Sequence, residues 1–259
     1  MGIAYGPTQN WLNNTPQGFQ YRIDNNFYVK DGLVLYLDAG DSNSYPGTGT
    51  TWTDLSGNDN NGTLVNGVGY SGSDGGSLVF DANNEYSTIP ATSNFDFGQD
   101  DFTISCFFKN NIKSVSQTDR RYLIHNETSW NGTRWVLYSS IDNNTDKAVF
   151  YTYPTFSTNG NLPLLVSSTT LNTSDWYNVV VSRINNTISL YLNGVQEDSE
   201  TITTAVGDSS YTTYIASGTT QTDRGLFGNI SNILIYKNKG LTPEEVQLNY
   251  NIFKGRYGL

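Results

Sequence analysis

The feature of this sequence that most constrains its fold is a period-two alternation of apolar and polar residues, repeated in many short segments. Leu33, Leu35 and Leu37 form the first apolar face. Asn, Gly, Asp or Pro bounds each run, and these residues favour turns. The alternation is typical of strands that bury one face. Further runs of this kind lie at 77–81, 102–109, 121–124, 134–140, 148–153 and 233–237.

Two runs near the C-terminus predict an antiparallel hairpin. Residues 176–183 and 187–193 are separated by only three residues, Ile184-Asn185-Asn186. Asn193-Gly194 then starts the next turn with residues that tolerate positive φ. We therefore expect neighbouring antiparallel strands here.

One segment near 242–253 carries the signature of a helix. Thr242 is a suitable N-cap, a proline follows it, and Glu245 completes a capping box. Val246 and Tyr250 lie four residues apart on one helical face. The segment predicts a short amphipathic helix that lies against the strands.

Length and charge limit the functions that this chain can have. A length of 259 residues suits one large β-sandwich. The formal net charge of −10 and a pI near 4.4 argue against nucleic acid as a partner, because phosphate binding needs clustered Lys and Arg. No stretch approaches the ~20 apolar residues that span a bilayer, and the opening MGIAYGPTQN lacks the pattern of a secretory signal. We expect synthesis in the cytoplasm and no membrane insertion.

Residues 1–30 differ from the rest of the chain, because they show no sustained period. We interpret them as an N-terminal arm that precedes a sandwich domain at 31–259. The aromatic residues of the arm need a partner that covers them, either the chain's own domain or a neighbouring chain. We expect a neighbouring chain, which makes the arm an assembly contact. The aromatic residues concerned are Trp11, Phe19, Tyr21, Phe27 and Tyr28.

The sequence supplies few groups for catalysis. His125 is the only histidine, and we expect it at the end of strand 121–124 rather than as a general base. Cys106 alternates with Ile104 and Phe108, which predicts a buried thiol. A zinc site made of Cys and His is excluded by these counts. The acidic pairs at 100–101 and 244–245 are explained by a turn and a helix start. We therefore expect no catalytic residues.

Several segments, in order, resemble the laminin-G-like, concanavalin-type jelly-roll superfamily, including its pentraxin-related modules. They are DGLVLYLDAGDSNSY, TWTDLSGNDNNGTL, GGSLVFDANNEYSTIP, DFTISCFFK, DWYNVVVSRINNTISLYLNGV and GNISNILIYKNKGLTPEEVQLNY. The resemblance covers residues 31–253 and implies an all-β, antiparallel two-sheet jelly roll with one short C-terminal helix. The residues expected in its core are Leu35, Phe80, Ile104, Phe108, Trp176, Val180, Leu190 and Ile235.

A looser resemblance links GLVLYLDAG, WTDLSGNDNNGTL and the ending KGRYGL to laminin-G-like domains of tailed-phage structural proteins. It implies a non-enzymatic virion protein, either a capsid-surface decoration or a tail or fibre appendage. Its expected place is the virion surface, and its expected partners are other virion proteins or copies of itself. The alternative is a stand-alone carbohydrate-binding, lectin-like module that recognises cell-surface glycans.

The pentraxin-like resemblance also points to two loops, 125–133 and 217–225, as counterparts of calcium-binding loops at one end of the sandwich. Calcium takes six to eight oxygen ligands, usually with several carboxylates. These loops hold fewer acids than that pattern, so we expect neither calcium nor another cofactor. The calcium candidates are Glu127, Asn131, Gln221 and Asp223.

The same loops hold the candidates for glycan binding. Sugars bind to exposed aromatic faces beside amide and carboxylate groups. Trp130 lies in the first loop with such neighbours, whereas Trp52, Trp135 and Trp176 are expected to be structural. The glycan candidates are Trp130, Asn131, Asn126 and Asp223.

Overall fold

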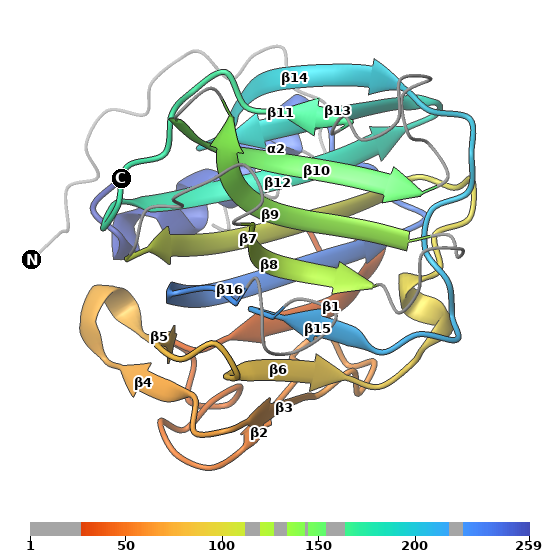
Figure 1. Cartoon of the computed structure of the whole chain (residues 1–259). Helices are drawn as coiled ribbons and strands as arrows, with labels where there is room; N and C mark the ends of the chain where they lie inside the picture. The colour runs from red at the N-terminus through yellow and green to blue at the C-terminus, as the bar shows by residue number, and fades with distance from the viewer. Residues whose placement is uncertain (1–26, 112–119, 127–133, 143–144, 154–163, 218–224) are drawn as a thin grey trace, which may run out of the picture.

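A computed structural model of the chain describes residues 27–111, 120–126, 134–142, 145–153, 164–217 and 225–259. Two antiparallel sheets lie face to face (Figure 1). Sheet A runs in the order β14 (Val195–Thr201), β13 (Thr187–Leu192), β12 (Trp176–Ile184), β7 (Phe102–Asn110), β16 (Gly228–Lys237), β5 (Ser77–Phe80) and β4 (Gly69–Ser71). β1 (Leu33–Asp38) also pairs with β16. It pairs with residues 232–236 of β16, whereas β5 pairs with residues 228–230.

Sheet B covers the inner face of sheet A. Its order is β11 (Leu165–Val166), β10 (Thr145–Tyr153), β9 (Arg134–Asp142), β8 (Arg121–Asn126), β15 (Thr213–Ile215), β6 (Tyr86–Ile89), β3 (Gly62–Val65) and β2 (Thr51–Trp52). The predicted all-β, two-sheet jelly roll is therefore confirmed.

The eight residues predicted for the core are all buried, but they belong to two different clusters. Six of them lie in the main core between the sheets. Trp176 and Val180 instead lie on the outer face of sheet A, in a second cluster with the C-terminal helix. β12 is therefore buried on both faces, which explains why its apolar residues form a continuous run.

The helix α2 (Pro243–Phe253) covers that outer face of sheet A. Thr242 Oγ1 accepts a hydrogen bond from the Glu245 amide at 3.3 Å, and Glu245 Oε2 accepts one from the Thr242 amide at 3.1 Å. The predicted capping box and helix are thus confirmed. Val246 and Tyr250 are buried against the sheet. None of the helices in the described ranges could cross a membrane.

The Asn-rich segment 54–62 is held by its own polar side chains. Asp54 Oδ1 accepts hydrogen bonds from the amides of Tyr36 and Ser56, at 2.8 and 2.9 Å. Its Oδ2 accepts from the Ser56 hydroxyl and the Asn60 amide, at 2.8 and 3.0 Å. The motif therefore builds a loop that clamps β1 to the start of sheet B.

The last residues of the predicted arm pack on their own domain. The Tyr28 ring centroid lies 4.9 Å from that of Tyr36. Val29 is fully buried, its amide donates to Asn249 Oδ1 at 2.9 Å, and its carbonyl accepts from Tyr236 at 2.9 Å. Tyr28 and Val29 thus contact the sandwich domain, and Tyr28 is half-buried. The assembly role of the arm stays a prediction.

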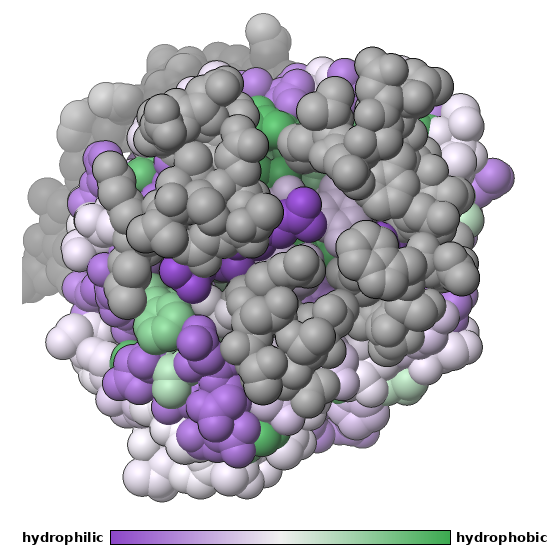
Figure 2. All heavy atoms as spheres, viewed as in Figure 1, coloured by the Kyte–Doolittle hydropathy of each residue, from purple (hydrophilic) through white to green (hydrophobic). Residues whose placement is uncertain are grey.

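Large exposed hydrophobic residues are scattered over the described surface. They are Phe27, Tyr70, Val195 and Leu259, which come from separate elements. Around β2, β3, β4 and β6 the visible described surface is mainly hydrophilic or neutral (Figure 2). Phe27 is 53% exposed, which leaves it available for the predicted assembly contact. Trp11, Phe19 and Tyr21 lie outside the described residues.

Candidate ligand-binding site

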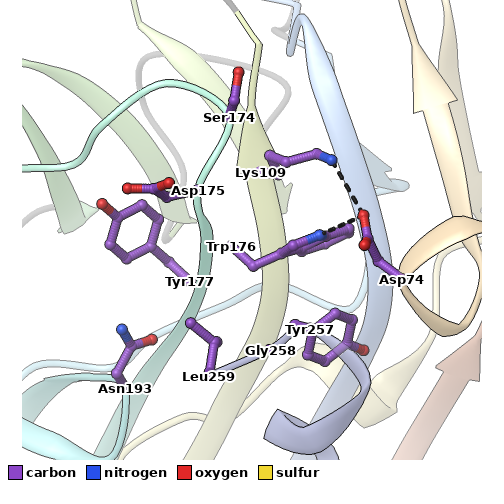
Figure 3. Close-up of a pocket in the computed structure, with 10 residues that line it drawn as sticks. All are labelled: Asp74, Lys109, Ser174, Asp175, Trp176, Tyr177, Asn193, Tyr257, Gly258 and Leu259. Carbon is purple, nitrogen blue, oxygen red and sulfur yellow. Dashed lines mark hydrogen bonds and ion pairs between the residues drawn. The ribbon is translucent and has the colours of Figure 1, made fainter.

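A pocket of about 550 Å³ opens at one end of sheet A, where β7 ends and β12 begins (Figure 3). Asp74 enters it from the short 3-10 turn η1 (Ser73–Gly75), and Lys109 from the end of β7. Trp176 comes from the start of β12, and Asn193 from the turn between β13 and β14. The C-terminal tail adds Tyr257. Five separate segments thus meet in one pocket.

Asp74 is held by two donors on one of its oxygens. Trp176 Nε1 donates to Asp74 Oδ2 at 2.9 Å, and Lys109 Nζ lies 3.3 Å from the same oxygen. Lys109 Nζ also lies 5.1 Å from the centre of the Trp176 ring. The hydrogen bond from Trp176, with a smaller contribution from Lys109, lowers the pKa of Asp74 below its ordinary value. Asp74 therefore stays ionised and acts as a fixed acceptor.

Three non-glycine residues around this pocket have left-handed backbone conformations. Their φ angles are 53° for Asp74, 70° for Ser174 and 51° for Asn193. This region costs energy for residues with a Cβ atom, least for Asp and Asn. Residues held in such conformations cluster at binding sites. Asp74 and Asn193 lie in the tight turns that bring them to the pocket.

The aromatic residues form the floor of the pocket. The Tyr257 ring lies 4.7 Å from Phe107 and 4.8 Å from Trp176, centroid to centroid. Trp176 and Tyr257 are only 5% and 7% exposed. Asp175 and Ser174 are exposed at the rim. A ligand would therefore meet mainly polar groups, set over a rigid aromatic base.

The glycan candidates from the sequence are not among the residues of this pocket. Asn126 lies within β8 and is fully buried. Its Nδ2 donates to the carbonyl of Tyr211 at 3.0 Å and to Thr213 Oγ1 at 3.2 Å, and its Oδ1 accepts from the Asp208 amide at 3.3 Å. The assignment of Asn126 to a glycan site is therefore wrong, because its amide already ties β8 to the segment around β15.

The remaining loop candidates lie outside the described residues. They are Glu127, Trp130, Asn131, Gln221 and Asp223. β8 and β15 are antiparallel, with Asn126 opposite Thr213 and Ile124 opposite Ile215. The first loop thus follows one end of this strand pair and the second loop the other, so the expectation that both start at one end is wrong. Within the described ranges, no group of three His, Cys, Asp or Glu residues could hold a metal.

His125 lies inside β8 rather than after it. It is fully buried, stacks on Tyr214 at 5.4 Å between ring centroids, and meets the edge of Tyr122 at 5.1 Å. Burial lowers its pKa to about 3, against an opposing hydrogen bond with the Ser217 backbone. The ring is therefore neutral at ordinary pH. Cys106 is buried as predicted, and burial raises the pKa of its thiol.

Sequence reasoning did not single out Asp74 or Lys109 as site residues. Asp74 stands in a Ser-Asp-Gly-Gly stretch that reads only as a turn, and Lys109 ends an apolar strand. The recognised Asn193-Gly194 turn was the one local signal that pointed to a pocket residue. Lys109 and Trp176 meet because β7 and β12 are paired, with Lys109 opposite Trp176, and Asp74 joins them through its hydrogen bond with Trp176.

Two antiparallel sheets stacked over one core, with a helix on the outer face of one of them, define the chain as a jelly-roll β-sandwich domain. A family model, Laminin_G_3, described as the concanavalin A-like lectin/glucanases superfamily, matches residues 80–247. The match covers more than half of the chain, which therefore belongs to this family. No curated protein sequence matches the chain.

Solved structures share the fold at low sequence identity. The binding domain of paraclostridial mosquitocidal protein 1 is 19% identical with a TM-score of 0.62, over 86% of this chain and 52% of that one. Domain 4 of the arabinanase AbnA from Geobacillus stearothermophilus, solved with arabinotriose, is 17% identical with a TM-score of 0.59, over 83% and 96%. Trypanosoma rangeli sialidase is 16% identical with a TM-score of 0.58, over 85% and 32%. The chain thus spans about half of the mosquitocidal protein chain and a third of the sialidase.

Proposed function

We propose that this chain is a non-enzymatic carbohydrate-binding domain and that the pocket around Asp74 holds the sugar. The observation that carries the proposal is the arrangement of a fixed carboxylate, an ammonium and an amide over a buried aromatic floor. Sugar hydroxyls both donate and accept hydrogen bonds, so they can use all three kinds of group. Sites of this kind are concave, with few but well-placed polar groups.

Asp74 is better suited to binding than to catalysis. Glycoside hydrolysis needs one carboxylic acid with a raised pKa, which can donate a proton to the leaving group. The pKa of Asp74 is lowered instead, first by the hydrogen bond from Trp176. An ionised carboxylate accepts hydrogen bonds from hydroxyl groups but cannot protonate a leaving oxygen.

The fold neighbours support the proposal at the level of the fold. One neighbour is a domain solved with arabinotriose, and another is the binding domain of a mosquitocidal protein. A role on a virion surface, with other virion proteins as partners, remains a prediction. If the chain is displayed there, glycan binding would serve attachment to the host.

The test is a glycan array followed by titration calorimetry on the whole chain. Asp74→Asn removes the charge with little change in shape, and we expect it to weaken binding about tenfold or more. Glu200→Gln, on the exposed edge strand β14, is the matched control and should leave binding unchanged. Trp130→Ala tests the loop: if it abolishes binding and Asp74→Asn does not, the sugar binds elsewhere. Absence of binding to any glycan would refute the function itself.

A further inference from the structure

We infer that the pocket selects uncharged saccharides and rejects those that carry a carboxylate or sulfate group. This inference rests on the proposed function and specifies the class of sugar. It follows from how the charges in the pocket are already paired.

The ammonium group of Lys109 is already paired with a carboxylate. It is 3.3 Å from Asp74 Oδ2 and lies over the face of Trp176, at 5.1 Å from the ring centre. The Lys109 side chain is 19% exposed, whereas that of Asp74 is 41% exposed. More of the Asp74 side chain than of the Lys109 side chain is therefore exposed, and an anion that approached the ammonium would also come close to the Asp74 carboxylate, which repels it.

Asp175 adds a second negative charge at the rim. Its Oδ2 accepts a hydrogen bond from Asn172 Nδ2 at 3.1 Å, which is a neutral donor. Across the described ranges, no cation forms an ion pair with Asp175. Two carboxylates and one paired ammonium thus leave the pocket net negative, in a chain whose formal net charge is −10. Like charges brought together in such a concave site repel.

A neutral sugar finds matching groups in the same pocket. Asp74 Oδ1 accepts no hydrogen bond from the described residues, so it can accept one from a hydroxyl group. Asn193 Oδ1 accepts from the Asn178 backbone amide at 2.9 Å. Asn193 Nδ2 donates to none of the described residues, so it can donate to a sugar oxygen. An ionised uronic acid carries no proton on its carboxylate and cannot donate to Asp74 through that group.

The experiment uses the whole chain on an array that pairs neutral oligosaccharides of galactose, glucose and mannose with their uronic-acid counterparts. We expect each acidic partner to bind at least about tenfold more weakly at low salt, with a smaller difference at high salt. Asp175→Asn should narrow that difference, while Glu200→Gln, a charge change away from the pocket, should not.

Three results are informative. The inference is supported if the difference in affinity between neutral and acidic partners becomes smaller in Asp175→Asn but not in Glu200→Gln. Equal binding of neutral and acidic partners overturns the inference and leaves the proposed function standing. Failure to bind any sugar overturns both.

Discussion

Arg256 binds both carboxylate oxygens of Asp38, with Nη1 2.7 Å from Oδ2 and Nη2 2.7 Å from Oδ1. The Asp38 side chain is only 3% exposed, and the Tyr36 hydroxyl donates to its Oδ2 at 2.8 Å. Two parallel hydrogen bonds between a guanidinium and a carboxylate are a strong and directional contact. This pair ties the C-terminal tail to the end of β1.

The same arginine fixes two walls of the candidate pocket. Its Nη2 donates to the carbonyl of Gly75 at 2.9 Å, directly after Asp74 in the chain. The next residue after Arg256 is Tyr257, which forms part of the pocket floor. Arg256 is therefore a positioning residue for the pocket, which it does not itself line.

We predict that Arg256→Ala lowers the free energy of unfolding by about 3 kcal/mol, because it leaves a buried carboxylate without its cation. Denaturant unfolding measures this change. Lys254→Ala, two residues earlier, is the matched control and should cost about 0.5 kcal/mol or less. Equal losses of unfolding free energy in the two variants would show that the ion pair between Arg256 and Asp38 does not stabilise the fold more than an ordinary surface side chain does.

Gly40 offers a steric test of the same junction. A Cβ atom at Gly40 would lie 1.8 Å from Arg256 Nη2 and 1.9 Å from the carbonyl oxygen of Gly75. We predict that Gly40→Ala destabilises the domain and displaces the tail. Gly72→Ala is the control, because a Cβ atom there meets nothing within 4 Å and the backbone φ is −77°. Thermal melts of the two variants should differ clearly, and similar melting temperatures would contradict the described junction.

We predict that His125 makes stability depend on pH between 7 and 5. Its pKa is about 3 in the folded chain and near 6.5 when unfolded, so the unfolded state binds the proton first as the pH falls. Stability present above pH 6.5 is then lost on acidification, by roughly 2 kcal/mol at pH 5. His125 is the only histidine of the chain, so His125→Phe should remove most of this slope. If the dependence of the unfolding free energy on pH is unchanged in the variant, other titrating groups cause it.

The position of Val29 predicts where the N-terminal arm can be cut. Deletion of residues 1–26 should leave the melting temperature within a few degrees of the full chain. Deletion of residues 1–30 should lower it strongly, because it removes buried Val29 and its bonds to Asn249 and Tyr236. If the shorter deletion also abolishes self-association in size-exclusion chromatography, the predicted assembly role of the arm is supported. If the shorter deletion unfolds the domain, the arm belongs to its core.

Local patterns were sufficient to predict the class of fold. Period-two runs bounded by turn residues indicate strands, and the capping box from Thr242 to Glu245 indicates the start of a helix. Both patterns involve only residues that are close in the sequence. The end of β8 was predicted two residues too early. His125 and Asn126 extend that strand because they pair with Tyr214 and Thr213 of β15, which no local pattern reveals.

By itself, the sequence determined which residues alternate, where turns fall and that the eight selected apolar residues are buried. Only the tertiary structure decided which side each of them faces, since Trp176 and Val180 pack in the outer cluster with α2 and the C-terminal tail rather than between the sheets. It alone also brought Arg256 to Asp38, 218 positions away, and set Asp74 beside Trp176. Contacts between distant segments depend on strand pairing and helix docking, and these leave no mark on the local periodicity of a single chain.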